Sequence, residues 1–214
     1  MDAWTRSGWI DISRPLETGT PGWPGDRPLR IEQREQDGAL LTAISTSCHI
    51  GTHLETGRHL RPDEGTVEGI ELDRLIGAAE VVEVEVREGL AVLPEGWSPR
   101  APRVLLRTGS FPLGGEPGEG FAALPAETVG WLADHGAQLI GIDTPSVDPL
   151  VSEDLPAHHA LADRGMVWIE GLWLGGVEPG LYLMAALPLN LVGAEAAPVR
   201  AAVRWIGRPG ETAS

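Results

Sequence analysis

Short apolar runs, each bounded by Gly, Pro or Asp, are the dominant pattern along the chain. Runs of this length with these boundaries are typical of strands in a buried sheet. The strands that we expect cover residues 81–86, 104–107, 139–142, 167–169 and 182–187. The pattern predicts that these strands together form a sheet.

Two longer segments carry the signals of helices. One covers residues 125–135 and the other residues 155–164, and a glycine follows each of them. Glycine suits the position after a helix because it reaches the left-handed conformation at little cost. At the start of the second helix, Asp154 is the expected cap and Pro156 suits the first turn.

The length of the chain suits a single domain. With 214 residues it can bury a sizeable core but is short for two independent domains, so we expect one domain over residues 1–214. The Gly- and Pro-rich residues 112–120 predict a surface loop, and residues 207–214 predict a terminal tail. Strands combined with helices predict a mixed α/β (α+β) fold.

The charge composition narrows the chemistry and the partners. The formal net charge is −15 at pH 7, and all 16 basic residues are arginine. A surface this acidic repels phosphate groups, so we do not expect nucleic acid as a partner. Without any lysine, the chain cannot form a Schiff base, which excludes pyridoxal enzymes and lysine aldolases.

The cysteine content and the lack of a signal peptide or a long apolar segment indicate where in the cell the protein is found. Cys48 is the one cysteine, so no intrachain disulfide can form. The first residues lack the basic and apolar regions of a signal peptide, and no apolar run approaches the ~20 residues of a membrane helix. We therefore expect a soluble protein of the cytoplasm that does not associate with membranes.

The strongest chemical signal is a run with three histidines, from His49 through His53 to His59. His49, His53 and Glu55 together offer two imidazoles and a carboxylate, a ligand set that suits zinc or manganese. In a straight strand, His49 and His53 would lie roughly 13 Å apart, too far to share one ion. The backbone must therefore bend between them, and Gly51 can supply that bend.

A second cluster lies further along the chain. His158 and His159 are adjacent on the expected second helix, where successive side chains point about 100° apart. His158 falls on the apolar face and is the better inward ligand, whereas His159 points away. Glu170 ends an apolar strand, where a buried carboxylate is costly unless it is paired or bound to metal.

Tryptophan is unusually frequent, with eight residues against two Phe and one Tyr. Trp23 lies in a turn built from Pro and Gly, where it can line a pocket or pack over the edge of the core. Ser146 lies in a Pro-rich turn after the strand at 139–142. Trp23 and Ser146 are our candidates for contact with a substrate.

These motifs resemble the cyclase family, in particular its bacterial kynurenine formamidases. The run from His49 to His59 resembles the family signature His-x-Gly-Thr-His-x-Asp-x-Pro-x-His. The likeness continues in the N-terminal segment at residues 11–26, in the Thr-Pro-Ser-Val-Asp-Pro motif at residues 144–149, and at residues 155–161 and 197–200. It thus covers nearly the whole chain.

The resemblance implies a fold, an activity and a site. The implied fold is the swivelling β/β/α fold of a homodimer, and the implied reaction is the hydrolysis of N-formylkynurenine to kynurenine and formate. One ion, zinc or manganese, would be bound by His49, His53 and Glu55, and a second by His158 and Glu170 with Glu55 shared. His59 would be the acid/base residue.

Two positions depart from the signature, since Glu55 replaces Asp and Gly57 replaces Pro. The longer carboxylate changes the reach of a bridging ligand, and a glycine loosens the segment that leads to His59. One or two ions per chain are therefore both compatible with the sequence.

Two alternatives to the formamidase remain open from the sequence. The first is a family relative that acts on another small aromatic or natural-product substrate, as hydrolase or cyclase, with one metal or none. The second is a binding protein that keeps the pocket without turnover. Retention of His59 beside the other histidines argues against the second alternative, because binding alone does not need an acid/base group.

Overall fold

A computed structural model describes residues 8–116, 118 and 120–207 of the chain. The strands are β1 (Trp9–Asp11), β2 (Arg30–Gln36), β3 (Ala39–Ser45), β4 (His53–Glu55), β5 (Ile76–Glu83), β6 (Glu85–Arg87), β7 (Leu90–Val92), β8 (Arg103–Arg107), β9 (Leu139–Ile142), β10 (Val167–Glu170), β11 (Gly180–Pro188) and β12 (Ala196–Gly207). The helices are α1 (Ala126–Asp134) and α2 (Pro156–Asp163), with short 3-10 turns η2 (Gly57–His59), η3 (Val67–Gly69) and η4 (Leu72–Arg74).

Within the described residues, eight strands form the main sheet, in the order β1-β12-β11-β5-β8-β9-β10-β4. Strands β5, β8, β9 and β10 run parallel to one another, whereas β11, β12 and β4 join antiparallel. Strand β4 also pairs with the first residues of β12, so the sheet closes on itself through β4. This closure matters because β4 carries His53 and Glu55, two of the predicted metal ligands.

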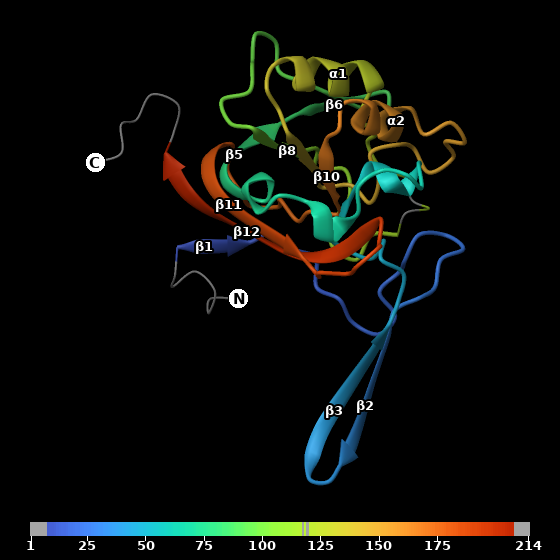
Figure 1. Ribbon diagram of the computed structural model, residues 1–214. Coiled ribbons are helices and arrows are strands. Elements are labelled where there is room, and N and C mark those ends of the chain that lie inside the picture. The colour runs from blue at the N-terminus through green and yellow to red at the C-terminus, as the bar shows by residue number, and fades with distance from the viewer. Residues whose placement is uncertain (1–7, 117, 119, 208–214) are drawn as a thin grey trace.

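Two apolar clusters hold the layers together. One fills the space enclosed by the curved sheet and includes Leu54, Ile169 and Met184. The other packs α1 and α2 against the outer face of the parallel strands, and it includes Val129 and Leu161. Figure 1 shows both helices on the same side of the sheet. The protein thus has a curved sheet folded around one core and a layer of helices on its outer face. This arrangement confirms the mixed α/β class expected from the sequence.

The expected elements are largely confirmed. Strand β9 has the predicted bounds, while β8, β10 and β11 match the prediction with ends one or two residues further out. Strand β5 instead begins five residues early and ends at Glu83 because Val84 bonds back to Arg107 and the chain turns into the β6–β7 hairpin. Gly136 and Gly165 adopt the left-handed conformation expected after α1 and α2.

One prediction about local structure was wrong, and another falls almost wholly outside the described residues. Asp154 does not cap α2: the cap position belongs to Leu155, which has a left-handed φ of 42°. Of the expected tail at residues 207–214, Gly207 is the last residue of β12, and the remainder lies outside the described residues. The carboxylate that accepts hydrogen bonds from the first backbone N–H groups of α2 is that of Asp148.

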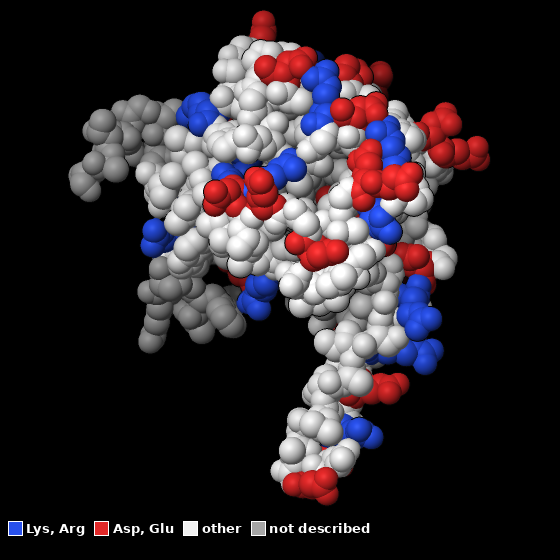
Figure 2. Space-filling model, viewed as in Figure 1, with Lys and Arg blue, Asp and Glu red and all other residues white. Residues whose placement is uncertain are grey.

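The β2–β3 hairpin projects away from the sheet as a long arm (Figure 1), which the apolar runs did not predict. Every residue of β3 is exposed. In Figure 2 the arm carries a few charged side chains along one edge and at its tip, and most of its visible surface is uncharged. None of the helices in the described part of the chain has the length and apolar character needed to cross a membrane.

Candidate active site

The bend predicted at Gly51 is present and brings the first two histidines together. Gly51 has a φ of +58°, and a Cβ there would lie 2.5 Å from the side chain of Leu16. The ring centroids of His49 and His53 are consequently 5.3 Å apart. A straight strand would separate the two residues by roughly 13 Å. The structure thus confirms that a glycine turn gathers these imidazoles.

Pairing of β4 with β10 adds two carboxylates to the histidines. His53 lies directly opposite Glu170 in the antiparallel register, so both side chains point to the same face. Glu55 follows two residues after His53 and therefore shares that face. His53 Nε2 lies 2.8 Å from Glu55 Oε1 and 3.3 Å from Glu170 Oε2, and all three residues are buried.

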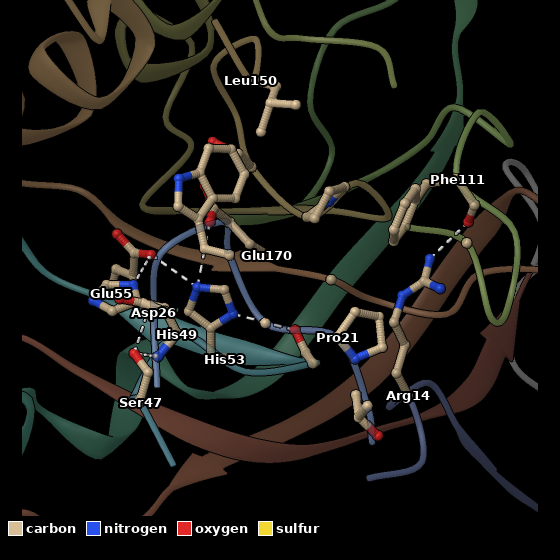
Figure 3. Close-up of a pocket in the computed structure, with 18 of the residues that line it drawn as sticks. Arg14, Pro21, Asp26, Ser47, His49, His53, Glu55, Phe111, Leu150 and Glu170 are labelled. Atoms are coloured by element: carbon tan, nitrogen blue, oxygen red, sulfur yellow. Dashed lines mark hydrogen bonds and ion pairs between the residues drawn. The ribbon is translucent and has the colours of Figure 1, made fainter. Parts of the chain in front are cut away.

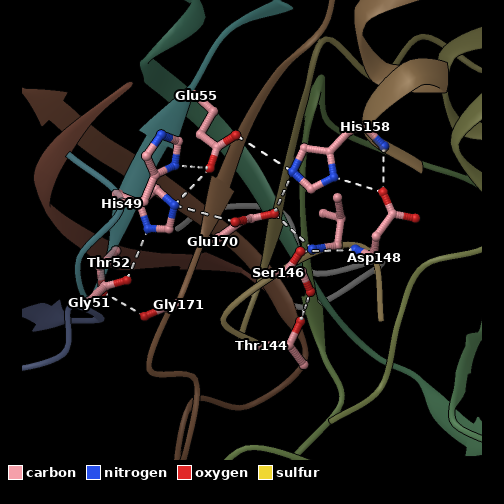
Figure 4. Close-up of polar contacts among 12 residues, drawn as sticks. His49, Gly51, Thr52, Glu55, Thr144, Ser146, Asp148, His158, Glu170 and Gly171 are labelled. Carbon is pink, nitrogen blue, oxygen red and sulfur yellow. Dashed lines mark hydrogen bonds and ion pairs between the residues drawn. The ribbon is translucent and has the colours of Figure 1, made fainter. Parts of the chain in front are cut away.

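Helix α2 presents His158 to the same cluster, as Figure 4 shows. His158 Nε2 lies 3.6 Å from Glu55 Oε2 and 3.4 Å from Glu170 Oε1. His158 is buried, whereas His159 is exposed, as the helical wheel predicted. The backbone N–H of Val147 donates to Glu170 Oε1 at 2.7 Å and helps to hold that carboxylate in place.

Asp148 fixes both the start of α2 and the ring of His158. Its two carboxylate oxygens accept hydrogen bonds from the backbone N–H groups of Ala157 and His158, and Oδ2 also lies 2.7 Å from His158 Nδ1. Burial opposes this arrangement, but the hydrogen bonds outweigh it and lower the pKa of Asp148. Asp148 therefore supports the site through the position and the ring of His158.

Glu55 lies at the centre of the cluster, with one oxygen toward each half. Oε1 faces His49 Nδ1 at 2.7 Å and His53, while Oε2 faces His158. Glu55 Oε2 is nevertheless buried without a hydrogen-bond partner among the described residues. An unsatisfied carboxylate oxygen in the interior is costly unless a cation compensates it.

The pKa values of the cluster also indicate that its carboxylates require a compensating positive charge. Burial alone would lower the pKa of both rings. The neighbouring carboxylates Glu170 and Glu55 nevertheless raise the pKa of His53 to about 10, and the hydrogen bond to Asp148 together with the charges of Glu55 and Glu170 raises that of His158 to about 10. Burial and the charge of Glu55 raise the pKa of Glu170. Two buried carboxylates thus demand positive charge, which bound protons supply here and a divalent cation can supply instead.

Among the described residues, two groups of three side chains have the spacing of metal ligands. In one, ligand atoms of His49, Glu55 and His59 all lie within 4.8 Å of one another, and in the other those of His53, Glu55 and Glu170 do so. The imidazole nitrogens and carboxylate oxygens are donors that zinc and manganese accept. The orphaned oxygen and the donor set together fit a divalent cation.

His59 lies at the edge of the cluster, at the end of η2. Its ring centroid is 4.5 Å from that of His49 and 5.7 Å from that of His158. The side chain remains accessible to solvent, while desolvation by the surrounding protein and the neighbouring imidazoles lower its pKa. A neutral imidazole at the mouth of the site can accept or donate a proton near neutral pH.

The cluster forms the floor of a cavity of about 940 Å³, shown in Figure 3. All the residues predicted for the site line this cavity: Trp23, His49, His53, Glu55, His59, Ser146, His158 and Glu170. Trp23 packs edge to face against Phe121, with ring centroids 6.4 Å apart. The Ser146 hydroxyl accepts a hydrogen bond from the Asp148 backbone at 3.2 Å, so it also holds the turn.

Arg14 and Glu195 also line the cavity, and the sequence patterns did not single them out. Arg14 donates hydrogen bonds to the backbone carbonyls of Phe111 and Asp143, and its guanidinium stacks on the Phe111 ring. Glu195 approaches His49 Nε2 at 3.2 Å. Their contacts join segments about 100 and 146 residues apart, and no local pattern in the sequence signals such contacts.

Buried histidines and carboxylates that converge on a cavity, on a mixed sheet covered by helices, define a metal-dependent enzyme of the hydrolase class. Comparison with known proteins agrees with this class. The Cyclase family profile matches residues 10–149. The chain is 41% identical to kynurenine formamidase from Salinibacter ruber over 91% of this chain and 96% of the relative. It is 38% identical to kynurenine formamidase from Geobacillus thermodenitrificans over 93% and 98% of the two chains.

A solved structure with a similar fold also belongs to a metal-dependent hydrolase. A predicted metal-dependent hydrolase from Bacillus stearothermophilus superimposes with a TM-score of 0.73 at 25% identity, over 91% of this chain and 97% of the other. The chain therefore belongs to the cyclase family. This confirms the fold and the hydrolase class that the histidine motif and its neighbouring sequences implied, and it argues against a binding protein without turnover.

Proposed function

We propose that this protein hydrolyses N-formylkynurenine to kynurenine and formate. The observation that carries the proposal is the convergence of His49, His53, Glu55, His158 and Glu170 at the floor of one cavity, with His59 at its mouth. The relatives from Salinibacter ruber and Geobacillus thermodenitrificans, which are kynurenine formamidases, support the substrate.

The same five side chains are the ones that would hold divalent cations, with zinc as the first candidate and manganese as the second. His49, His53 and Glu55 would bind one ion, and His158, Glu170 and the second oxygen of Glu55 would bind another. When bound, a divalent cation supplies Lewis acidity that polarises a carbonyl oxygen and lowers the pKa of a water molecule. Because each Glu55 oxygen faces one half of the cluster, we propose two ions per chain.

His59 would move the proton that the reaction requires. Hydrolysis adds water to the formyl carbon, breaks the bond from that carbon to the aryl nitrogen, and leaves the nitrogen in need of a proton. A neutral His59 can take a proton from water and return it to the departing amine. Its lowered pKa favours this neutral form.

The walls of the cavity suit an aromatic substrate. Trp23 provides an aromatic face beside Phe121, and an aryl ring gains from edge or offset contact with such a face. Ser146 offers a hydroxyl near the cluster. We propose that Trp23 and Ser146 orient the substrate so that its formyl group meets the cluster.

The direct test is formate release from N-formylkynurenine by purified protein with zinc or manganese added. We expect turnover that His59→Ala reduces by about 10²–10⁴-fold, the usual contribution of acid/base catalysis. The matched control is His159→Ala, which removes an exposed histidine of α2 and should leave turnover unchanged. Absence of formate with either metal would refute the substrate, and hydrolysis of another aromatic compound instead would favour the family relative with a different substrate.

We also propose that the protein is a cytoplasmic homodimer. The exposed arm supports the dimer, because a two-stranded hairpin is marginally stable alone and gains from packing against another surface. Leu40 and Ile44 on that arm are 67% and 68% exposed. The single cysteine, Cys48, supports a reducing compartment, and the charge of −15 supports a small-molecule substrate rather than nucleic acid.

A further inference from the structure

We infer that Glu195 is a positioning residue for His49, which it orients through a hydrogen bond so that the opposite ring nitrogen faces the proposed metal site. The inference rests on the proposed metal site and adds to it a sixth side chain with a different task. Glu195 Oε1 lies 3.2 Å from His49 Nε2, on the side of the ring away from the cluster. On the other side, His49 Nδ1 faces Glu55 Oε1 at 2.7 Å.

The other two histidines of the cluster have the same arrangement. His53 turns Nε2 to the cluster, and its Nδ1 lies 3.2 Å from the carbonyl oxygen of Gly51. His158 turns Nε2 to the cluster, and its Nδ1 lies 2.7 Å from Asp148. An acceptor on the outer nitrogen holds the proton there and leaves a lone pair on the inner nitrogen, which is the form that binds metal. Glu195 completes this set for His49.

The backbone of Glu195 is held firmly enough to serve this purpose. Its carbonyl oxygen accepts hydrogen bonds from both the backbone N–H and the hydroxyl of Thr56, the residue that follows Glu55. The next residue, Ala196, pairs with Glu55 in the sheet. Glu195 therefore has a fixed position relative to Glu55, and through its carboxylate it fixes the ring of His49 relative to both.

As a hydrogen-bond acceptor for His49, Glu195 would act differently from a metal ligand or from a group that binds a charged end of the substrate. A metal ligand needs the charged oxygen itself, and so does a group that binds the ammonium end of a substrate. A hydrogen-bond acceptor for His49 needs only an oxygen, which the amide of glutamine also has. Glutamine at position 195 therefore separates orientation of His49 from both charge-dependent roles.

The test is zinc affinity, measured by competition between the zinc-loaded protein and a chromophoric chelator. We expect Glu195→Ala to weaken zinc binding about tenfold, the lower end of the usual loss for such partners because this side chain is 37% exposed. Glu195→Gln should recover most of the affinity. A KM for the proposed substrate that is unchanged in Glu195→Gln would agree with this role.

Glu68→Ala is the matched control for loosening of the segment. Glu68 accepts a hydrogen bond from the backbone of Gly193, two residues before Glu195, and has no contact with His49 among the interactions of the described residues. We expect its zinc affinity to equal that of the unaltered protein. Equal losses in Glu68→Ala and Glu195→Ala would overturn the inference, as would full affinity in Glu195→Ala.

Three other outcomes would also overturn the inference. They differ in whether the proposed metal site would remain valid. A loss in Glu195→Gln as large as in Glu195→Ala would make Glu195 a ligand. A raised KM in Glu195→Gln with normal zinc affinity would assign it to the substrate. Failure of the unaltered protein to bind zinc would refute the metal site itself, whereas the first two outcomes would leave that site intact.

Discussion

At the scale of single residues, the two departures from the family signature have structural counterparts. Glu55 uses its greater length to reach both halves of the cluster, since its two oxygens face His49 and His158. Gly57 leaves room for Glu64: a Cβ at position 57 would lie 2.7 Å from the carboxyl carbon of Glu64 and 3.4 Å from Ala162. The space that a proline ring would need at position 57 is thus occupied by another side chain.

Glu64 also restrains the segment that a glycine alone would loosen. It forms an ion pair with Arg61 at 2.9 Å, and Arg61 in turn pairs with Asp163 at the end of α2. The backbone of Gly57 accepts hydrogen bonds from Leu60 and Arg61. The position of His59 therefore depends on this network rather than on a rigid residue at position 57.

We predict energetic coupling between positions 57 and 64. Gly57→Ala should lower the free energy of unfolding by about 1 kcal/mol, because the new methyl group displaces the Glu64 carboxylate. In a Glu64→Ala background the same substitution should cost much less. Urea denaturation of the four proteins in a double-mutant cycle measures the coupling. Additive effects of the two substitutions would show that Glu64 does not fill the space beside Gly57.

At the scale of elements, helix α2 is the clearest case in which a residue outside the helix and its adjacent positions takes the role that the local sequence assigned to Asp154. The sequence offered Asp154, which lies next to the helix, but the carboxylate that bonds the first backbone N–H groups is that of Asp148. The same carboxylate orients His158. The start of the helix and the geometry of the site are therefore fixed by one group.

We predict that Asp148→Asn destabilises the protein by about 1–2 kcal/mol, the typical value of a helix cap. Both oxygens of Asp148 accept hydrogen bonds from backbone N–H groups of α2. In asparagine one of these oxygens is replaced by an NH₂ group, which cannot accept, so one hydrogen bond would become a repulsive contact between two donors. The loss should appear as a lower midpoint in urea denaturation, together with weaker zinc binding. Asp154→Ala is the control and should change stability by less than about 0.5 kcal/mol. The reverse ranking would restore Asp154 as the cap.

At the scale of the whole molecule, the arm formed by β2 and β3 stands out from the closed sheet (Figure 1). Exposed apolar side chains on a projecting hairpin are typical of a surface that packs against another chain. In a two-fold symmetric dimer, each arm would pack on the other copy, and the same contact would bury the apolar side chains of both arms.

We predict that the double variant Leu40→Ser and Ile44→Ser weakens dimerisation at least tenfold while leaving the monomer folded. Both side chains are about two-thirds exposed, so their loss should not affect the core. Light scattering after size-exclusion chromatography gives the mass, and circular dichroism reports the fold. Leu72→Ser, at a residue 62% exposed on the body of the protein, is the control. A monomeric unaltered protein, or a variant that dimerises normally, would contradict the prediction.

Local patterns were sufficient for much of the fold, and they named candidate site residues that the structure brings together around one cavity. Apolar runs located strands β8 to β11 with small errors, since a buried strand needs such a run wherever it lies. The spacing of His49, Gly51 and His53 predicted a bend that the structure contains. The wheel position of His158 predicted its burial, because the apolar face of a helix must turn inward.

Contacts between distant segments were decided only by the tertiary structure. Strands β4 and β12 escaped prediction because one is a three-residue strand and the other is rich in alanine, and both are defined by their pairing with each other. The roles of Asp148 and Glu195 likewise depend on which backbone lies beside them. By itself, the sequence determined which residues must be buried and which could bind a cation, since these follow from side-chain chemistry and spacing. The arrangement that places Glu55 between His49 and His53 on one side and His158 on the other arises only when β4, α2 and the glycine bend meet. The energy of each carboxylate depends on neighbours that only folding supplies.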